Sequence, residues 1–211
     1  MSDDAATVDE LTTRLLDEGD RDDRVAFRGL QYDLGLAWVH FPEGWGGLGL
    51  PPVHQRRVDD ALRKAGAPGP STEHFFGLTM AGPTVVTHAD EALKRRLLRP
   101  MFTGEDSWCQ LFSEPGAGSD LAGLACRAVR DGDEWIITGQ KVWNTLAHLA
   151  NRGMLVARTD PDAPKHKGMT YFALDMTAPG VEVRPLRQIT GEAEFNEVYL
   201  TEVRVPDADR I

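Results

Sequence analysis

Cysteine and long apolar runs are scarce in this sequence. Only Cys109 and Cys126 occur among 211 residues, too few for a disulfide scaffold, so we expect both to be small buried hydrophobes in a reducing compartment. No run of about 18 apolar residues exists, so we expect no membrane-spanning segment. The acidic N-terminus contains no apolar signal-peptide core. These absences predict a cytoplasmic protein.

Basic residues are also few. Lysine and arginine total 23 against 33 acidic residues, which gives a formal net charge of −10. An acidic surface repels nucleic acids and anionic membranes, so we expect neither as a partner. The six histidines show no metal-ligand spacing, so we expect no metal site.

Apolar residues recur at helical spacing through the first hundred positions. Asp90 is in position to cap the last of these helices. The segment Phe75–Thr87 is apolar nearly all round, which predicts a buried helix. The predicted helices cover Val8–Leu16, Arg24–Leu34, Val53–Ala65, Phe75–Thr87 and Glu91–Phe102.

Short strands replace helices from about Ser107 onward. Asp131-Gly132 is a turn pair that favours a two-residue hairpin between its flanking strands. Strands this short and regularly spaced indicate an antiparallel sheet or barrel. We therefore predict an α+β chain: an all-α helical domain over residues 1–106, then an antiparallel β-barrel or sandwich domain over residues 107–211. The predicted strands are Trp108–Phe112, Arg127–Arg130, Glu134–Thr138, Met154–Arg158, Met169–Asp175, Val181–Pro185 and Glu194–Val205.

The stretch Gly44–Gly49 matches the G-x-G-x-x-G pattern of dinucleotide-binding proteins. That pattern binds pyrophosphate only when a strand precedes it and a helix begins inside it. Pro51 and Pro52 follow almost at once and oppose such a helix. We interpret the stretch as a tight surface loop anchored by Trp45 and Leu48.

A glycine-containing loop follows the predicted strand Trp108–Phe112. It reads Ser-Glu-Pro-Gly-Ala-Gly-Ser-Asp over Ser113–Asp120. Gly116 and Gly118 leave the backbone uncrowded, so that successive N–H groups can converge on an anion. Serine hydroxyls can add hydrogen bonds to a phosphate or a heterocycle. Composition alone leaves a ligand loop and an ordinary hairpin loop equally open.

A second motif, Gly139–Thr145, follows the predicted strand Glu134–Thr138. Trp143 can pack on a planar redox ring, and Thr145 can hydrogen-bond a ring nitrogen. Taken alone, this motif favours a simpler interpretation, in which Trp143 belongs to the core.

Together the two motifs resemble the middle domain of the acyl-CoA dehydrogenase family, in which a strand, EPGAGSD, a hairpin, GxK and W-x-[ST] follow in that order. Glu197–Pro206 resembles the closing strand of that domain, and Phe41–Gly49 resembles a loop between the family's early helices. The resemblance spans nearly the whole chain. Asn144 and Leu146 depart from the commoner W-I-[ST]-N form of the motif, which puts the role of the residue after Thr145 in doubt.

The resemblance implies an N-terminal helical domain, a middle β domain and a C-terminal helical domain, with FAD between the last two. Ser119 would lie near both the pyrophosphate and the acyl-CoA substrate. Trp143 would flank the flavin ring, with Thr145 near its N5. The implied cofactor-binding residues are Gln110, Phe112, Ser113, Gly118, Ser119, Trp143 and Thr145.

The implied activity is that of an oxidoreductase of fatty acid β-oxidation, which dehydrogenates an acyl-CoA thioester between its α and β carbons. Electrons would pass to an electron-transfer flavoprotein, and the intact enzyme would be a homo-oligomer. The family's catalytic glutamate lies in the C-terminal domain, and no glutamate in residues 1–211 matches it. We therefore expect no catalytic residue here and an inactive chain when alone. Glu114 is interpreted as orienting its loop.

Two alternatives stay open. The chain could be a non-catalytic half-subunit that needs a partner chain carrying the missing helices. The same scaffold could also serve an acyl-CoA oxidase or a flavin monooxygenase, because the base and the path for oxygen depend largely on residues outside these 211.

Overall fold

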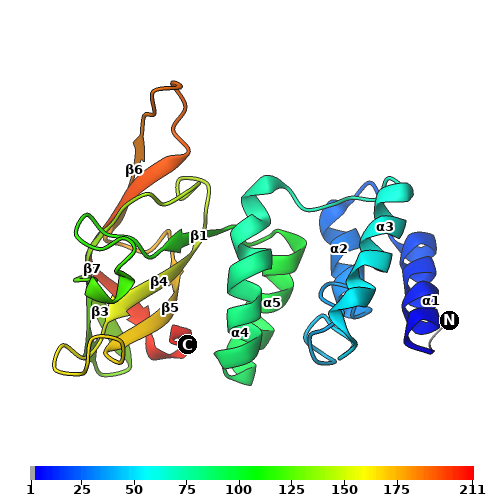
Figure 1. Cartoon of the computed structure of the whole chain (residues 1–211), viewed down its shortest axis with the longest axis horizontal. Coiled ribbons are helices and arrows are strands. Elements are labelled where there is room, and N and C mark those ends of the chain that lie inside the picture. The colour runs from blue at the N-terminus through cyan, green and yellow to red at the C-terminus, as the bar shows by residue number, and fades with distance from the viewer. Residues whose placement is uncertain (1–2) are drawn as a thin grey trace. The chain divides into compact units, whose positions relative to one another are not determined.

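The computed structural model describes residues 3–211 and divides into two compact units, one ending at Asp106 and the other spanning Ser107–Ile211 (Figure 1). The first unit is helical. No helix among residues 3–211 is long and apolar enough to cross a membrane. The helices are α1 (Asp3–Glu18), α2 (Arg24–Asp33), α3 (Gln55–Lys64), α4 (Gly82–His88) and α5 (Glu91–Thr103), with 3-10 turns at Pro52–His54 and Thr72–His74.

Side-chain caps and one apolar core define the first unit. The carboxylate of Asp90 accepts a hydrogen bond from the Leu93 amide at 2.8 Å, which confirms the predicted N-cap of α5. Asp23 caps α2 through the Ala26 amide at 3.0 Å. Helices α1 to α3 and the segment that follows α2 bury one shared set of side chains, namely Val8, Leu15, Phe27, Leu36, Val39 and Val58.

The segment Phe75–Thr87, predicted as one buried helix, is neither fully buried nor a single regular helix. Phe75 is 57% exposed, Gly77–Ala81 forms a π-helical turn, and α4 begins only at Gly82. Pro83 accounts for the irregularity, because it has no N–H to donate and its ring crowds the carbonyl four residues earlier. A π turn widens the helix there, and the Gly82 amide bonds the Gly77 carbonyl five residues back.

The Gly44–Gly49 stretch is a loop, as predicted. No strand precedes it within residues 3–43, and the chain folds back so that the Gly49 amide bonds the Phe41 carbonyl at 2.8 Å. The Trp45 ring lies 5.2 Å from the Arg95 guanidinium of α5. Leu48 packs against the helical core. The loop is therefore held from both sides and does not have dinucleotide-binding geometry.

The second unit is a curled seven-stranded sheet in the order β1-β4-β2-β3-β7-β6, with β5 paired to β4. Its predicted β class is confirmed, but the expectation of a purely antiparallel sheet was wrong, because β1 and β2 both pair with β4 in parallel. Parallel pairing needs a long connection, and the hairpin formed by β2 and β3 supplies it. The strands are β1 (Trp108–Leu111), β2 (Arg127–Asp131), β3 (Glu134–Lys141), β4 (Arg152–Arg158), β5 (Met169–Asp175), β6 (Val181–Leu186) and β7 (Phe195–Pro206).

The predicted hairpin turn and the predicted burial of both cysteines are confirmed. Asp131 pairs with Glu134 across the turn, and Gly132 has φ +63°. Cys109 and Cys126 are free thiols in the sheet core. Burial raises the pKa of the Cys109 thiol to about 12 and that of Cys126 to about 11, so both stay protonated at neutral pH.

Gly139 lies where the register of β3 against β7 shifts. A Cβ at this position would come within 2.7 Å of the Cα, Cβ and Sγ atoms of Cys126. A side chain therefore cannot enter here unless β3 moves away from the segment before β2 that carries Cys126.

We expect Gly139→Ala to lower the free energy of unfolding by about 1–3 kcal/mol, because the added methyl overpacks a contact with backbone atoms. Chemical denaturation of the apoprotein measures the change. Gly116→Ala is the matched control: a Cβ there meets nothing within 4 Å, so its stability should stay within about 0.5 kcal/mol of wild type. Equal stabilities for the two variants would contradict the packing argument.

Candidate functional site

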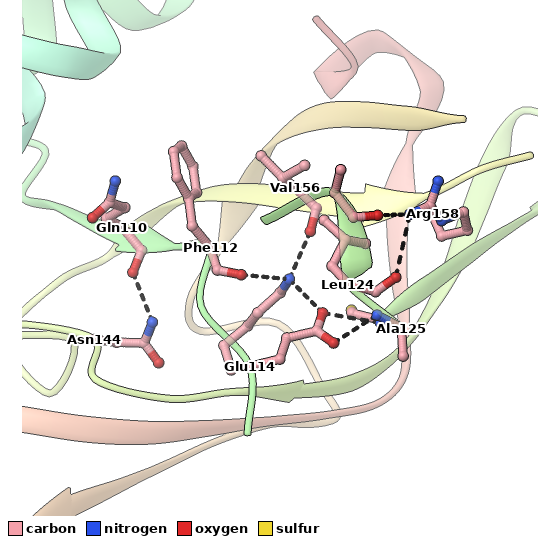
Figure 2. Close-up of polar contacts among 11 residues, drawn as sticks. Gln110, Phe112, Glu114, Leu124, Ala125, Asn144, Val156 and Arg158 are labelled. Atoms are coloured by element: carbon pink, nitrogen blue, oxygen red, sulfur yellow. Dashed lines mark hydrogen bonds and ion pairs between the residues drawn. The ribbon is translucent and has the colours of Figure 1, made fainter. Parts of the chain in front are cut away.

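The ammonium of Lys141, at the end of β3, joins that strand to two other segments of the β domain, the loop after β1 and the strand β4. Its side chain is fully buried. It donates to the carbonyl of Phe112 at 3.1 Å, to the carbonyl of Val156 at 2.8 Å and to Oε1 of Glu114 at 2.8 Å. Figure 2 shows these three acceptors converging on the one nitrogen. All three N–H groups of the lysine are thereby used.

Glu114, the glutamate of the first motif, is 8% exposed, and its carboxylate accepts three hydrogen bonds. Besides Lys141, it accepts from the amide of Ala125 at 2.6 Å and from the amide of Cys126 at 3.0 Å. Its backbone exchanges two hydrogen bonds with Ala117, at 2.8 and 3.1 Å, which closes the loop. These contacts fix the loop, as the sequence interpretation of Glu114 required. They also leave this carboxylate poorly placed to act as a base.

Further hydrogen bonds hold the second motif beside the first. The Val142 amide donates to the Ser113 carbonyl at 2.9 Å. The side-chain amide of Asn144 donates to the Gln110 carbonyl at 2.7 Å (Figure 2). On its other side, Asn144 exchanges hydrogen bonds with Asn196, whose amide nitrogen donates to the Asn144 carbonyl at 2.8 Å. The two predicted motif segments are therefore directly bonded to each other.

Trp143 projects outward from this anchored segment. It lies between the buried residues Val142 and Asn144, but its own side chain is 63% exposed. Its φ is +62°, a left-handed value that a bulky residue adopts only when its surroundings hold it there. The Phe195 ring meets the indole edge-on at 6.1 Å between centroids. The fold thus holds a large flat ring at the surface in a strained backbone.

The polar side chains predicted to bind a cofactor are free of competing partners. Four of these side chains form no hydrogen bond with any other group in residues 3–211. Gly118 is exposed, and a Cβ there would meet nothing within 4 Å. Phe112 is half-buried, and its carbonyl is taken by Lys141. The four free side chains are Gln110, Ser113, Ser119 and Thr145.

Three residues that organise these segments were missed or undervalued in the sequence. Lys141 stood inside the second motif, but nothing local showed that it is buried. Asn144 was noted only as a departure from the usual motif, and no sequence pattern indicated a role for Asn196. Within residues 3–211, no group of three or more His, Cys, Asp or Glu side chains could hold a metal ion.

Comparison with known protein families matches both units. The model described as acyl-CoA dehydrogenase, N-terminal domain, matches residues 6–105. The model described as acyl-CoA dehydrogenase, middle domain, matches residues 109–203, which include both motif segments. The chain belongs to the acyl-CoA dehydrogenase family. The family resemblance predicted from the motifs is therefore confirmed.

Two curated relatives of this chain are proteins of Mycobacterium tuberculosis. Acyl-CoA dehydrogenase FadE34 is 50% identical over 175 residues, which are 83% of this chain and 24% of FadE34. Acyl-CoA dehydrogenase IpdE1 is 43% identical over 177 residues, which are 84% of this chain and 45% of IpdE1. The chain thus spans less than half the length of either relative.

Solved structures of the family share the fold. The steroid ACAD Tcur3481-Tcur3483 superposes with a TM-score of 0.70 at 30% identity, over 97% of this chain and 56% of that one. The ChsE4-ChsE5 complex from Mycobacterium tuberculosis gives a TM-score of 0.70 at 29% identity, over all of this chain and 56% of that one. The names of both proteins join two components.

We expect Lys141→Met to lower the free energy of unfolding by about 3–5 kcal/mol, because it leaves the buried Glu114 carboxylate without its cation. Urea denaturation measures the loss. The double variant Lys141→Met/Glu114→Leu should recover part of it, since neither charge is then stranded.

Lys165→Met is the control for this prediction. Lys165 also pairs with a carboxylate, that of Asp120, but both side chains are exposed. An exposed pair contributes little to stability, so the urea midpoint should hardly move. The burial argument fails if both lysine variants lose the same stability.

Proposed function

We propose that the whole protein is an FAD-dependent acyl-CoA dehydrogenase, in which this chain provides the helical domain and the flavin-facing β domain. One observation carries the proposal: free polar side chains, an open glycine loop and a strained, exposed tryptophan gather where the two motif segments are bonded together. A purely structural junction would have no need to keep the hydroxyls of Ser113 and Thr145 without partners or to hold Trp143 at positive φ.

The residues present suit the cofactor. An isoalloxazine ring is flat, and the exposed indole of Trp143 offers it a flat surface. The hydroxyl of Thr145 and the side chain of Gln110 can donate to heteroatoms at a ring edge. The open backbone around Gly118, with the Ser119 hydroxyl, can meet a pyrophosphate. When bound, FAD would supply the redox chemistry by accepting a hydride from the substrate's β carbon.

This chain's own part in the reaction would be to bind and orient the flavin and to exclude water from the site. Removal of the α-proton requires a base, and we assign none to residues 1–211. Glu114 is excluded by its contacts, because its carboxylate already accepts from Lys141 and from two backbone amides. We place the base outside these residues. An electron-transfer flavoprotein would then reoxidise the flavin.

A two-chain enzyme is the second candidate, and it follows from the solved relatives whose names join two components. In that case this chain would be one subunit of a hetero-oligomer rather than of a homo-oligomer. Because one of these relatives is named a steroid ACAD, a ring-bearing acyl-CoA is also a candidate substrate. Co-purification of the full-length protein with a second, helical chain would favour this assembly.

Anaerobic titration of the full-length flavoprotein tests the activity. Acyl-CoA should bleach the flavin absorbance without oxygen, and an electron-transfer flavoprotein should restore it. A straight-chain and a steroid acyl-CoA, titrated in parallel, decide the substrate class. Rapid peroxide formation in air would instead support an oxidase, and absence of flavin from the purified protein would defeat the proposal.

We expect Ser119→Ala and Thr145→Ala each to weaken flavin retention about fivefold, since a lost hydrogen bond costs about 1 kcal/mol. Flavin content after dialysis and the Kd from fluorescence titration of the apoprotein measure the effect. Thr177→Ala is the control, because Thr177 belongs to neither motif segment and its hydroxyl donates to the Asp175 carboxylate at 2.7 Å. The assignment is wrong if both site variants retain flavin as Thr177→Ala does.

A further inference from the structure

A cleft of about 560 Å³ lies wholly within the helical unit. Residues of α2, α3 and α5 line it, together with Ala37, Trp38, His40, Ala67–Pro70 and Leu78–Thr79. Its surface is mainly apolar, with the rings of Trp38 and Phe102 centred 5.0 Å apart. The volume falls within the range of small-molecule sites, roughly 300–1,000 Å³.

A buried cation forms part of the cleft wall. Arg28 is 2% exposed. Its Nε donates to the Phe102 carbonyl at 2.8 Å, and its guanidinium lies 4.1 Å from the centre of the Phe102 ring. Its Nη2 has no hydrogen-bond partner within residues 3–211. Burial, together with the nearby charge of Arg24, lowers the pKa of Arg28 to about 10. No carboxylate among the described residues compensates this charge.

The other charged groups of the cleft are exposed and already have partners. Arg63 forms an ion pair with Asp60 at 2.9 Å, and Asp59 is the one carboxylate that the described residues contribute to the lining. Asp59 is exposed and already accepts from the side-chain amide of Gln55 at 3.1 Å. Arg28 is therefore the charge of the cleft that is buried without a counter-charge among the described residues. Gln31, one turn from Arg28, has a buried Oε1 without a donor among residues 3–211; this oxygen is an acceptor and adds no attraction for a carboxylate.

We propose that this cleft binds a small organic carboxylate, whose acid group pairs with Arg28 and whose apolar body lies against Trp38 and Phe102. A buried guanidinium is stable only when a counter-charge or several acceptors meet it. A bidentate carboxylate supplies both. The site shares no residue with the two flavin-facing segments, so it goes beyond the function proposed above.

Isothermal titration of the full-length protein with cinnamate tests the site, and cinnamyl alcohol serves as the neutral comparator of nearly the same shape. The acid should bind at least about tenfold more tightly than the alcohol, since hydrogen bonds to a charged group contribute about 1.5–3 kcal/mol and about 1.4 kcal/mol is tenfold in affinity. This comparison uses the wild-type protein and needs no variant.

Two variants locate the binding. Arg28→Met should weaken cinnamate binding at least about tenfold and alter alcohol binding by less than about threefold. Arg56→Met is the matched control: Arg56 also lies on α3 but outside the cleft lining, and its side chain is 88% exposed, so both affinities should stay within about threefold of wild type. Arg28→Met should still fold, since an apolar chain replaces an uncompensated buried charge. Thermal unfolding checks this point.

Equal affinity for the acid and the alcohol would overturn the proposal, as would cinnamate binding that Arg28→Met leaves unchanged. Absence of binding by either compound would also overturn it. In that last case, a carboxylate from another part of the full-length protein would be the expected partner of Arg28. Replacing the carboxylate residues one at a time and measuring cinnamate binding would identify it, because loss of the partner should restore binding.

Discussion

The buried ammonium of Lys141 is the interaction on which the β domain's functional surface depends. Moving an ammonium out of water costs several kcal/mol even after relaxation, and the loss is recovered only by a close counter-charge and well-placed acceptors. Lys141 finds these on Phe112, Glu114 and Val156. Because the acceptors belong to segments that lie apart from Lys141 in sequence, the ammonium is compensated only when all of them are in place.

The position of Trp143 follows from that constraint. A left-handed backbone at a bulky residue costs of order 1–3 kcal/mol and persists only when neighbouring contacts enforce it. Lys141 fixes the chain just before Trp143. Asn144 fixes it just after, through Gln110 and Asn196. With both flanks anchored inward, the indole between them has no route into the core and remains at the surface.

Local chemistry in the sequence was enough to predict much of the fold. The Asp90 cap and the Asp131-Gly132 turn depend on neighbours a few residues away. The parallel pairing of β1 with β4 could not be predicted from such neighbours, because the alternation of side chains along a strand is the same whether its partner is parallel or antiparallel. The candidate site divides similarly. Trp143 was recognisable within its motif, whereas the importance of Asn196 arises only from its contact with Asn144, 52 residues distant.

The two units each bury a cation, and the contrast between them separates structural from functional burial. Lys141 meets one carboxylate and two carbonyls, so its charge is compensated by the fold itself. Arg28 meets one carbonyl and a ring face, and a ring quadrupole contributes only about 2 kcal/mol or somewhat more to a desolvated cation. That is less than the cost of burying a charge. Compensation of Arg28 must therefore come from beyond the described residues, and the open cleft beside it is where a counter-ion has room to enter.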